Sequence, residues 1–348
     1  MAVTPLSIGN ELLSTTMHIV MKEWRDNIYT STALLDAQTR VHGEGQPTQA
    51  GGTRIVVPLG FGEHSNTTKM STGYERIDLS VSDVFQPAVY DFGHVVRPVA
   101  ISAEEELTNQ GDAAVLSILE NRVTSVANAL KREYVKHIVQ GGVANWDDWN
   151  TLNGIDRTNG YLENAAAGSG SQNASVGGVS KATFSSKTGW NNQFFNIADS
   201  FNSNGLAGLY DLMVEINAVS AQGNPNVILA SRAGFKNLKR ALQASERYMD
   251  EKSIDGGKMS TTFQGVPIDV EYYMPNAGTT SATTEASFYF LNMNDIYTLW
   301  DPKGYFDLSD FETVSGEYDV RAAKLRCRGQ LIAKHLGSSA LAVNGDTF

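Results

Sequence analysis

Residues Asp112 to Gln140 read DAAVLSILENRVTSVANALKREYVKHIVQ, and this is the longest helical pattern in the chain. Asp112 is a favourable N-cap, and Gly141 and Gly142 end the run. Apolar side chains recur at three- and four-residue steps, which is the period of one helix face. They are Leu116, Leu119, Val123, Ala127, Leu130, Tyr134 and Ile138. At 1.5 Å per residue the helix would be about 40 Å long, longer than an ordinary globular helix, so the stretch predicts a structural spine.

A two-helix coiled coil is the alternative for this stretch. Its apolar repeat drifts from strict heptads, and the flanking positions offer few opposite charges for pairing between helices. A single long helix packed on other elements is therefore favoured.

The segment before the spine has the two-residue period of strands. Thr53 to Leu59 alternates in this way, and after a Gly-rich crossing Glu75 to Val81 alternates again, which predicts a long two-stranded arm. A further extended run, Val89 to Val99, leads to the helix. Because an isolated hairpin is marginal in water, the arm needs a surface to lie on, either in its own chain or in a neighbouring copy.

The N-terminal part has the pattern of an arm rather than of a domain core. Ile8 to Asp36 has a broadly helical period, and the glycines and proline between Arg40 and Pro47 then break regular structure.

The part after the spine divides into a spacer and an α+β half. Asn145 to Ser186 is rich in Gly, Ser, Asn and Ala, so we expect a flexible loop that buries little, with short paired strands at Trp149–Ile155 and Val176–Val179. The second half alternates helices and strands, which predicts a central sheet. The expected helices are Phe195–Gln222, with a break near Gly205, and Ala233–Ala244. The expected strands are Asn226–Ser231, Phe263–Tyr273, Ser287–Leu291, Asp295–Trp300 and Ala322–Gly337, followed by an apolar run at Ala340–Val343.

Composition narrows the function classes. The 348 residues are 41% hydrophobic and 19% charged, which is ordinary globular usage and predicts a folded chain of roughly two or three domains. A net charge of −11 disfavours general adhesion to nucleic acid or to an anionic membrane, because both require clustered Lys and Arg. The first residues lack the pattern of a signal peptide, and no run approaches the ~20 apolar residues of a membrane span, so we expect synthesis in the cytoplasm and no membrane partner.

No motif predicts catalysis, a metal or a cofactor. The chain lacks HExxH, CxxC, a phosphate-binding loop and a GxSxG elbow. Its six histidines are scattered, and none lies four residues from another. Cys327 alternates with Arg326 and Arg328, which places it on the opposite strand face and predicts a buried apolar role rather than a reactive thiol. We therefore expect no enzyme activity.

Charged residues gather at three places. Glu104, Glu105 and Glu106 precede the spine, where they suit a nearby helix N-terminus or a basic side chain of an adjacent subunit. A second, acidic set suits solvent or a subunit contact better than a calcium loop, whose spacing it lacks. It comprises Asp301, Asp307, Asp310, Glu312, Glu317 and Asp319. A basic set on one predicted strand has the charge to answer such acids across an interface, and it comprises Arg321, Lys324, Arg326 and Arg328.

The order of these parts resembles the major capsid protein of tailed bacteriophages, which has the HK97-like fold. The resemblance covers nearly the whole chain and rests on order rather than on any one motif. The segments that carry it are Ile101–Leu107 with the spine, Trp149–Ile155 with Gly177–Ala182, Leu209–Met213, Pro225–Ser231 and Phe263–Ile268. The family implies an N-terminal arm (residues 1–52), an extended loop over the neighbouring subunit (53–100), a peripheral domain with a following loop region (101–190), an axial domain (191–320) and a returning C-terminal strand (321–348).

The resemblance implies a structural role in a virion. Pentamers and hexamers would form an icosahedral shell in the host cytoplasm and enclose double-stranded DNA without sequence specificity. A portal protein is an implied partner, and a cement or decoration protein is a further one. The chain lacks the long N-terminal scaffolding region of some members, so scaffolding is expected from a separate protein. Some members crosslink a Lys to an Asn of another subunit; Lys69 lies near the loop tip, but no motif identifies its partner.

Three other classes of protein are alternatives to a phage capsid protein. An encapsulin-like cellular nanocompartment shares the fold and would be distinguished by a cargo-docking peptide on a neighbouring gene, in place of terminase and portal genes. A soluble hydrolase would need a nucleophile and base that no spacing here supplies. A surface adhesin is disfavoured by the absent export signal.

Overall fold

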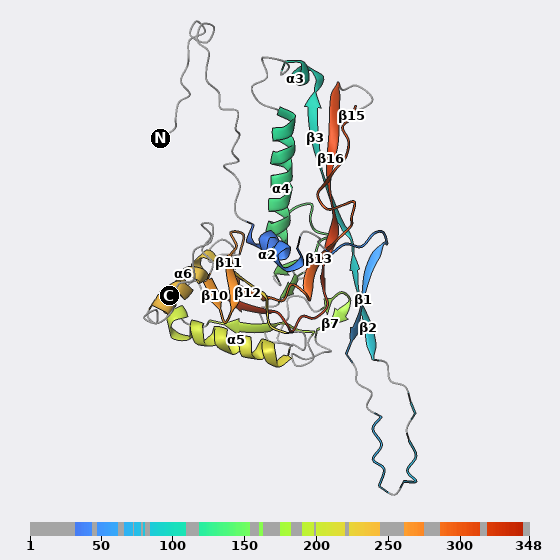
Figure 1. The fold of residues 1–348 in the computed structure, drawn as a ribbon, viewed down its shortest axis with the longest axis vertical. Coiled ribbons are helices and arrows are strands. Elements are labelled where there is room, and N and C mark those ends of the chain that lie inside the picture. Colours follow the sequence, from blue (N-terminus) through green and yellow to red (C-terminus); the bar gives the residue numbers. More distant parts are fainter. Residues whose placement is uncertain are drawn as a thin grey trace.

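The computed structural model describes residues 32–43, 47–61, 66–71, 73–77, 79–80, 84–108, 118–153, 160–162, 175–181, 190–197, 200–219, 223–243, 261–274, 286–313 and 319–343. The outline is elongated: a long helix stands above a lobe that contains the central sheet, and a narrow two-stranded arm projects from the opposite end (Figure 1).

The long helix is α4 (Ile118–Gln140), which confirms the predicted spine over those residues; 112–117 lie outside the described part. It lies beside a ribbon of β3 (Gly93–Ser102) and β16 (Val320–Ala333), which pair antiparallel along their lengths. Leu130, Tyr134 and Ile138 of the predicted stripe are fully buried by the chain itself. This packing favours the single-helix interpretation over the coiled coil.

An aromatic cluster joins the foot of the spine to the ribbon. Tyr134 has ring centroids 5.9, 5.8 and 5.2 Å from Trp146, Trp149 and Trp300, and its hydroxyl lies 2.6 Å from Thr298 Oγ1. Gly93 lets β3 approach this cluster, because a Cβ there would lie 2.3 Å from the Trp149 ring. The same cluster corrects the prediction that residues 145–186 bury little.

That loop region buries more than its composition indicates. Trp146 and Trp149 are buried, and so is Lys181, whose Nζ donates to the Tyr161 carbonyl at 2.7 Å. Its short strands are β4 (Thr151–Asn153) with β5 (Gly160–Leu162), and β6 (Ser175–Val176) with β7 (Val179–Ser180). Large aromatic side chains buried between glycines and polar residues outweigh the average polarity of the segment.

The two strands of the arm are formed by different segments from those predicted. β1 (Arg54–Gly60) pairs antiparallel with β2 (Phe85–Asp91), not with residues 75–81. Of those seven residues, 75–77, 79 and 80 are described and lie in no strand. The reason is burial: Ala88 and Tyr90 of β2 join the core with Ile55, whereas Ile77 and Leu79 are exposed. An alternating segment forms a stable strand only where its apolar face is buried against a core.

The lobe contains a six-stranded sheet in the order β10, β11, β9, β12, β17, β8. The strands are β8 (Gln193–Asn196), β9 (Val227–Ala230), β10 (Thr261–Phe263), β11 (Val266–Val270), β12 (Ala286–Leu291) and β17 (Ala340–Val343). Helices α5 (Leu206–Val219) and α6 (Arg232–Gln243) share one apolar core with one face of this sheet, and the other face joins the core beneath the spine. In Figure 1, α5 lies along the lower edge of the lobe and α6 at its left edge.

Two helix boundaries differ from the predictions. Phe195 and Asn196 belong to β8, and a π-helical turn, η3 (Phe201–Gly205), precedes α5, so the predicted break at Gly205 is the junction between them. The only N-terminal helix in the described residues is α2 (Ala33–His42), which continues past Asp36 and ends at Gly43 with φ 71°. Most of the predicted helix Ile8–Asp36 lies outside the described residues.

The remaining strands flank β16. They are β13 (Ile296–Trp300), β14 (Asp307–Leu308) and β15 (Glu312–Thr313). Cys327 on β16 is buried as predicted, and burial raises the pKa of its thiol. In the described part of the chain, no helix has the length and apolar character needed to cross a bilayer.

Candidate intersubunit surface

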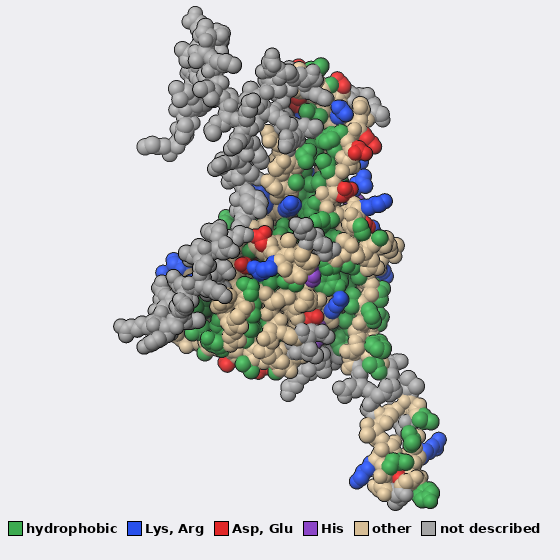
Figure 2. All heavy atoms as spheres, viewed as in Figure 1, with side chains coloured by type: hydrophobic (Ala, Val, Ile, Leu, Met, Phe, Trp, Pro, Cys, Tyr) green, Lys and Arg blue, Asp and Glu red, His purple; other side chains and the backbone are tan. Residues whose placement is uncertain are grey.

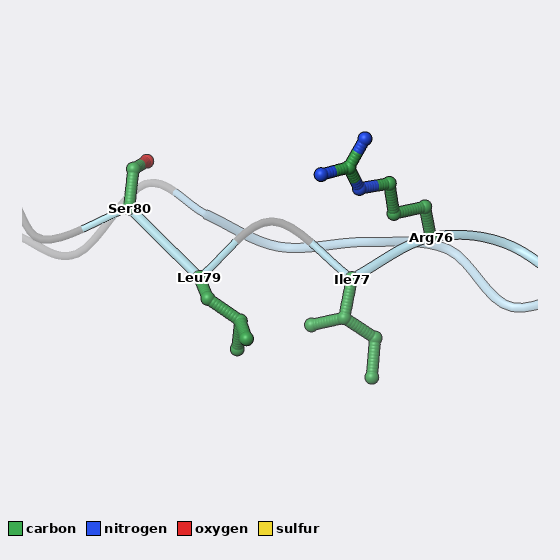
Figure 3. Close-up of a pocket in the computed structure, with 4 residues that line it drawn as sticks. All are labelled: Arg76, Ile77, Leu79 and Ser80. Atoms are coloured by element: carbon green, nitrogen blue, oxygen red, sulfur yellow. The ribbon is translucent and has the colours of Figure 1, made fainter.

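The extended loop exposes large apolar side chains. Tyr74 is 96% exposed, Leu79 85% and Phe85 77%, with Met70, Ile77 and Val56 also exposed. Near the tip, Ile77 and Leu79 point to one side of the loop, and Arg76 and Ser80 to the other, around a shallow hollow (Figure 3). The space-filling view shows hydrophobic side chains on the surface of the projecting arm (Figure 2). An apolar set of this kind is typical of a surface that another molecule covers.

The base of the loop is held by a glycine hairpin. The Val89 N–H donates to the Gly177 carbonyl at 2.9 Å, and Gly177 adopts φ 59°. A Cβ on Gly177 would lie 2.8 Å from the Ala88 Cβ. The sequence indicated only a short strand here, and the contact between Gly177 and Val89 had no local signal.

Of the glutamates before the spine, Glu105 has a role within the chain. Its N–H donates to Ser102 Oγ and its Oε2 accepts from the Ser102 N–H, both at 3.2 Å, as in a capping box at the start of α3 (Ala103–Thr108). Its carboxylate also forms a two-point ion pair with Arg122, which with the Ser102 hydrogen bonds lowers the pKa of Glu105 to about 2. Glu104 is exposed, and the side chain of Glu106 lies outside the described residues.

The basic strand meets acids of its own chain. Arg328 pairs with Asp301, donates to the Gly52 carbonyl at 3.1 Å and lies 4.6 Å from the Phe92 ring. Arg326 and Asp307 occupy opposed positions of β16 and β14. The acids and bases that the sequence suggested for an interface are therefore partly brought together inside one subunit.

Four of the candidate basic residues lie on open surface. Arg321, Lys324 and Arg326 are exposed on β16, and Lys69 is exposed on the extended loop. Arg321 makes a further interaction within the chain. Among the ion pairs of the described residues, none involves Lys324 or Arg326, so these two are the basic side chains of the strand with the most freedom to meet another molecule.

Ser338, His335 and Asp295 lie together, but their hydrogen bonds stabilise a turn and do not form a catalytic triad. Ser338 Oγ donates to Asp295 Oδ2 at 2.6 Å, while the Ser338 N–H donates to His335 Nδ1 at 3.1 Å. The hydroxyl thus faces the carboxylate rather than the imidazole, and Ser338 is fully buried. A nucleophile needs a base on its own hydroxyl, so this arrangement only fixes the turn between β16 and β17. No group of three metal-ligating side chains occurs in the part of the chain that the structure describes.

Solved structures similar to this chain include subunits of phage capsids and of an encapsulin shell. The chain resembles the capsid of Cyanophage A-1(L) with a TM-score of 0.65 and 13% identity, over 98% of this chain and 99% of that one. The capsid of a native GTA particle gives 0.60 and 12% over 98% and 99%, and the SrpI encapsulin complex of Synechococcus elongatus PCC 7942 gives 0.58 and 10% over 97% and 96%. No family model and no curated protein sequence matches the chain.

These likenesses define the fold. At sequence identities near one residue in eight, the role of a residue in those proteins cannot be assigned to a residue of this chain. The structural similarity nevertheless spans nearly the full length of both chains. The predicted α+β, HK97-like fold is confirmed. The similar structures are structural shell proteins rather than enzymes, which is consistent with the motifs missing from the sequence.

Proposed function

We propose that the chain is a major capsid protein, which self-assembles as pentamers and hexamers into the icosahedral shell of a virion around packaged double-stranded DNA. The observation that carries the proposal is a full-length capsid fold whose extended loop presents Tyr74, Leu79 and Phe85 to solvent. Burying such side chains is worth roughly 1.5–3 kcal/mol each, so a neighbouring copy that covers them gains a large part of the assembly energy.

The domain roles are part of the same proposal. Residues 1–52 act as an N-terminal arm, 53–100 as the loop over the neighbour, 101–190 as the peripheral domain with its following loop region, 191–320 as the axial domain and 321–348 as the returning strand. Lys324 and Arg326 on β16, with Glu104 beyond the capping box, are the charged candidates for contacts between subunits. Scaffolding, portal and cement proteins are the expected partners, and assembly takes place in the host cytoplasm.

The net charge of −11 supports a container for DNA rather than a DNA-binding protein. A wall that repels phosphate lets DNA be packed without adhering to it. The charge is therefore compatible with packaging that does not depend on sequence.

Electron microscopy of the purified chain, alone and with a candidate scaffolding protein, tests the proposal. Closed shells, or rings of five and six subunits, are expected. A monomer or dimer under both conditions would contradict it.

An encapsulin-like nanocompartment is the second candidate, favoured by the similarity to the SrpI encapsulin complex. The contents of native particles separate the two. Nuclease-protected double-stranded DNA supports the capsid, and a co-purifying protein that carries a docking peptide supports the nanocompartment.

A further inference from the structure

The two helices of the lobe have opposite charge. α6 carries Arg232, Lys236, Lys239 and Arg240 and no acidic residue. α5 carries Asp211 and Glu215 and no basic residue. The chain as a whole has 38 acidic and 27 basic residues, so the charge of α6 is opposite in sign to that of the whole protein.

The fold turns these charges outward. Leu209, Leu212 and Ile216 of α5 pack into the same core as Phe235 and Leu238 of α6, against one face of the sheet. With the apolar faces so placed, Asp211 and Glu215 are exposed on α5, and Arg232 and Lys236 are exposed on α6. Acidic and basic side chains are therefore exposed on two helices that pack against the same face of the sheet.

The described part of the chain leaves these charges largely uncompensated. Its ion pairs include none of Asp211, Glu215, Lys236 and Lys239. Arg232 lies 4.7 Å from the Tyr272 ring and Lys239 6.0 Å from the Phe235 ring, contacts that orient the cations without neutralising them. Arg240 has another interaction within the chain.

The acidic surface also has an apolar component. Tyr210 is 44% exposed and Val214 62%, one helical turn apart and next to Asp211 and Glu215. A patch of exposed apolar groups rimmed by acids fits a basic protein surface and repels a nucleic acid. A second copy of this chain offers such a basic surface in α6.

We propose that α6 of one subunit contacts α5 of the next around each closed ring of subunits. The proposal rests on the proposed capsid function and adds the residues that select the neighbour. A head-to-tail contact joins two different patches, and repeated by rotation it closes a ring. Lys236 and Lys239 span about 5 Å along the helix axis, and Asp211 and Glu215 about 6 Å, so the two pairs match in spacing.

Charge reversal on one helix at a time tests the contact. The α6 variant is Lys236→Glu with Lys239→Glu, and the α5 variant is Asp211→Lys with Glu215→Lys. Each is expected to raise the concentration needed for ring formation about tenfold or more, because like charges then face each other. The chain with all four substitutions is expected to return to within about threefold of the wild type, since the pairing is restored with its sign exchanged.

A mixture of the two variants gives the sharpest result. An α6-reversed subunit matches only an α5-reversed neighbour, so the two kinds must alternate around a ring. Alternation closes a ring of six but not a ring of five. Mass photometry and negative-stain images of the mixture should therefore show hexamers without pentamers.

A matched control reverses two exposed lysines of the spine, Lys131→Glu with Lys136→Glu. Circular dichroism and melting temperature confirm the fold of every variant. The inference is overturned if the wild type forms rings and the single-helix variants form them equally well. It is also overturned if the chain with all four substitutions needs as high a concentration for ring formation as either single-helix variant. If α6 reversal leaves rings intact but lowers the DNA retained in shells, α6 faces nucleic acid and the inference is wrong. A wild type that never assembles would instead count against the proposed function.

Discussion

Arg122 on the spine and Glu105 on α3 form a two-point ion pair, with Nη2 2.6 Å from Oε1 and Nη1 2.8 Å from Oε2. Arg122 Nη1 also donates to the Ala100 carbonyl at 3.0 Å. The pair ties the upper end of the spine to the end of β3, where the chain turns from ribbon to helix.

The first prediction concerns the effect of acidic pH on the stability that this ion pair provides. Hydrogen bonds from Arg122 and Ser102 lower the pKa of Glu105 from 4.5 to about 2. A lowered carboxyl pKa stabilises the fold above the unfolded value and loses that effect as pH falls from 4.5 to 2. Melting curves should therefore show wild type and Glu105→Gln converging towards pH 2, with wild type modestly more stable at pH 7. A constant difference across that range would show that the pair does not act through charge.

The second prediction concerns Glu271, which is fully buried and accepts from the Leu34 N–H at 3.0 Å. Burial raises its pKa to about 7, against an ordinary 4.5, despite hydrogen bonds from backbone N–H groups. Here the folded state binds the proton more tightly, so stability falls as pH rises from 4.5 to 7. Glu271→Gln should remove this loss, which is on the order of 3 kcal/mol, and leave a flatter profile of unfolding free energy against pH.

The measurement for Glu271 is urea unfolding at pH 4.5, 6 and 8, with Glu215→Gln on the exposed face of α5 as the control. Hydrogen exchange at α2 gives a second readout, because the Glu271 carboxylate accepts from the first turn of that helix. Parallel pH profiles for wild type and Glu271→Gln would contradict the assignment.

The third prediction concerns the glycine hairpin under the extended loop. Gly177→Ala forces a residue with a side chain into φ 59° and places its Cβ 2.8 Å from Ala88. Gly178 is also at positive φ, 78°, but a Cβ there has no neighbour within 4 Å. Gly178→Ala should cost about 1 kcal/mol from backbone strain alone, and Gly177→Ala about 1–3 kcal/mol more together with weaker assembly. Equal effects of the two substitutions would mean that the contact with β2 does not direct the loop.

The fourth prediction separates folding from assembly on the loop. Leu79→Ser with Phe85→Ser removes two exposed side chains, so the unfolding free energy of the unassembled chain should change by less than about 1 kcal/mol. Assembly should need a concentration at least about tenfold higher, because the apolar area that a neighbour buries is lost. Unchanged assembly would remove the loop from the proposed interface.

The fifth prediction concerns Lys324 and Arg326. Reversal of both to Glu leaves the in-chain pair of Arg328 with Asp301 untouched. If β16 contacts a neighbour through these two residues, assembly should weaken at low salt and recover as salt is raised, because salt screens the repulsion that the reversal creates. Assembly at wild-type concentration across salt would withdraw β16 from the list of contacts.

The sequence was sufficient for elements whose signal is local. The spine, β9, α6 and the burial of Cys327 follow from period, caps and alternation. The pairing of β1 with Phe85–Asp91 was not predictable, because Glu75–Val81 has the clearer alternation, and only the core beneath Tyr90 selects Phe85–Asp91 instead.

The candidate site was less predictable than the fold. The sequence identified Glu105 and Arg328, but their partners, Arg122 and Asp301, are 17 and 27 residues away. Asp301 reaches Arg328 because β13 pairs with β16, and Arg122 reaches Glu105 because α4 lies beside the end of β3. Likewise, Gly177 has no local mark of its contact with Ala88. Contacts between distant segments depend on register, and one chain carries no direct record of register.

Cryo-electron microscopy of the particle assembled from the purified chain would show whether the chain is a capsid subunit. Closed shells built from rings of five and six are expected, with the loop around Tyr74 and Leu79 lying over the neighbouring subunit. A chain that stays monomeric at every concentration tested, or a particle whose loops fold back on their own subunits, would contradict the proposed function.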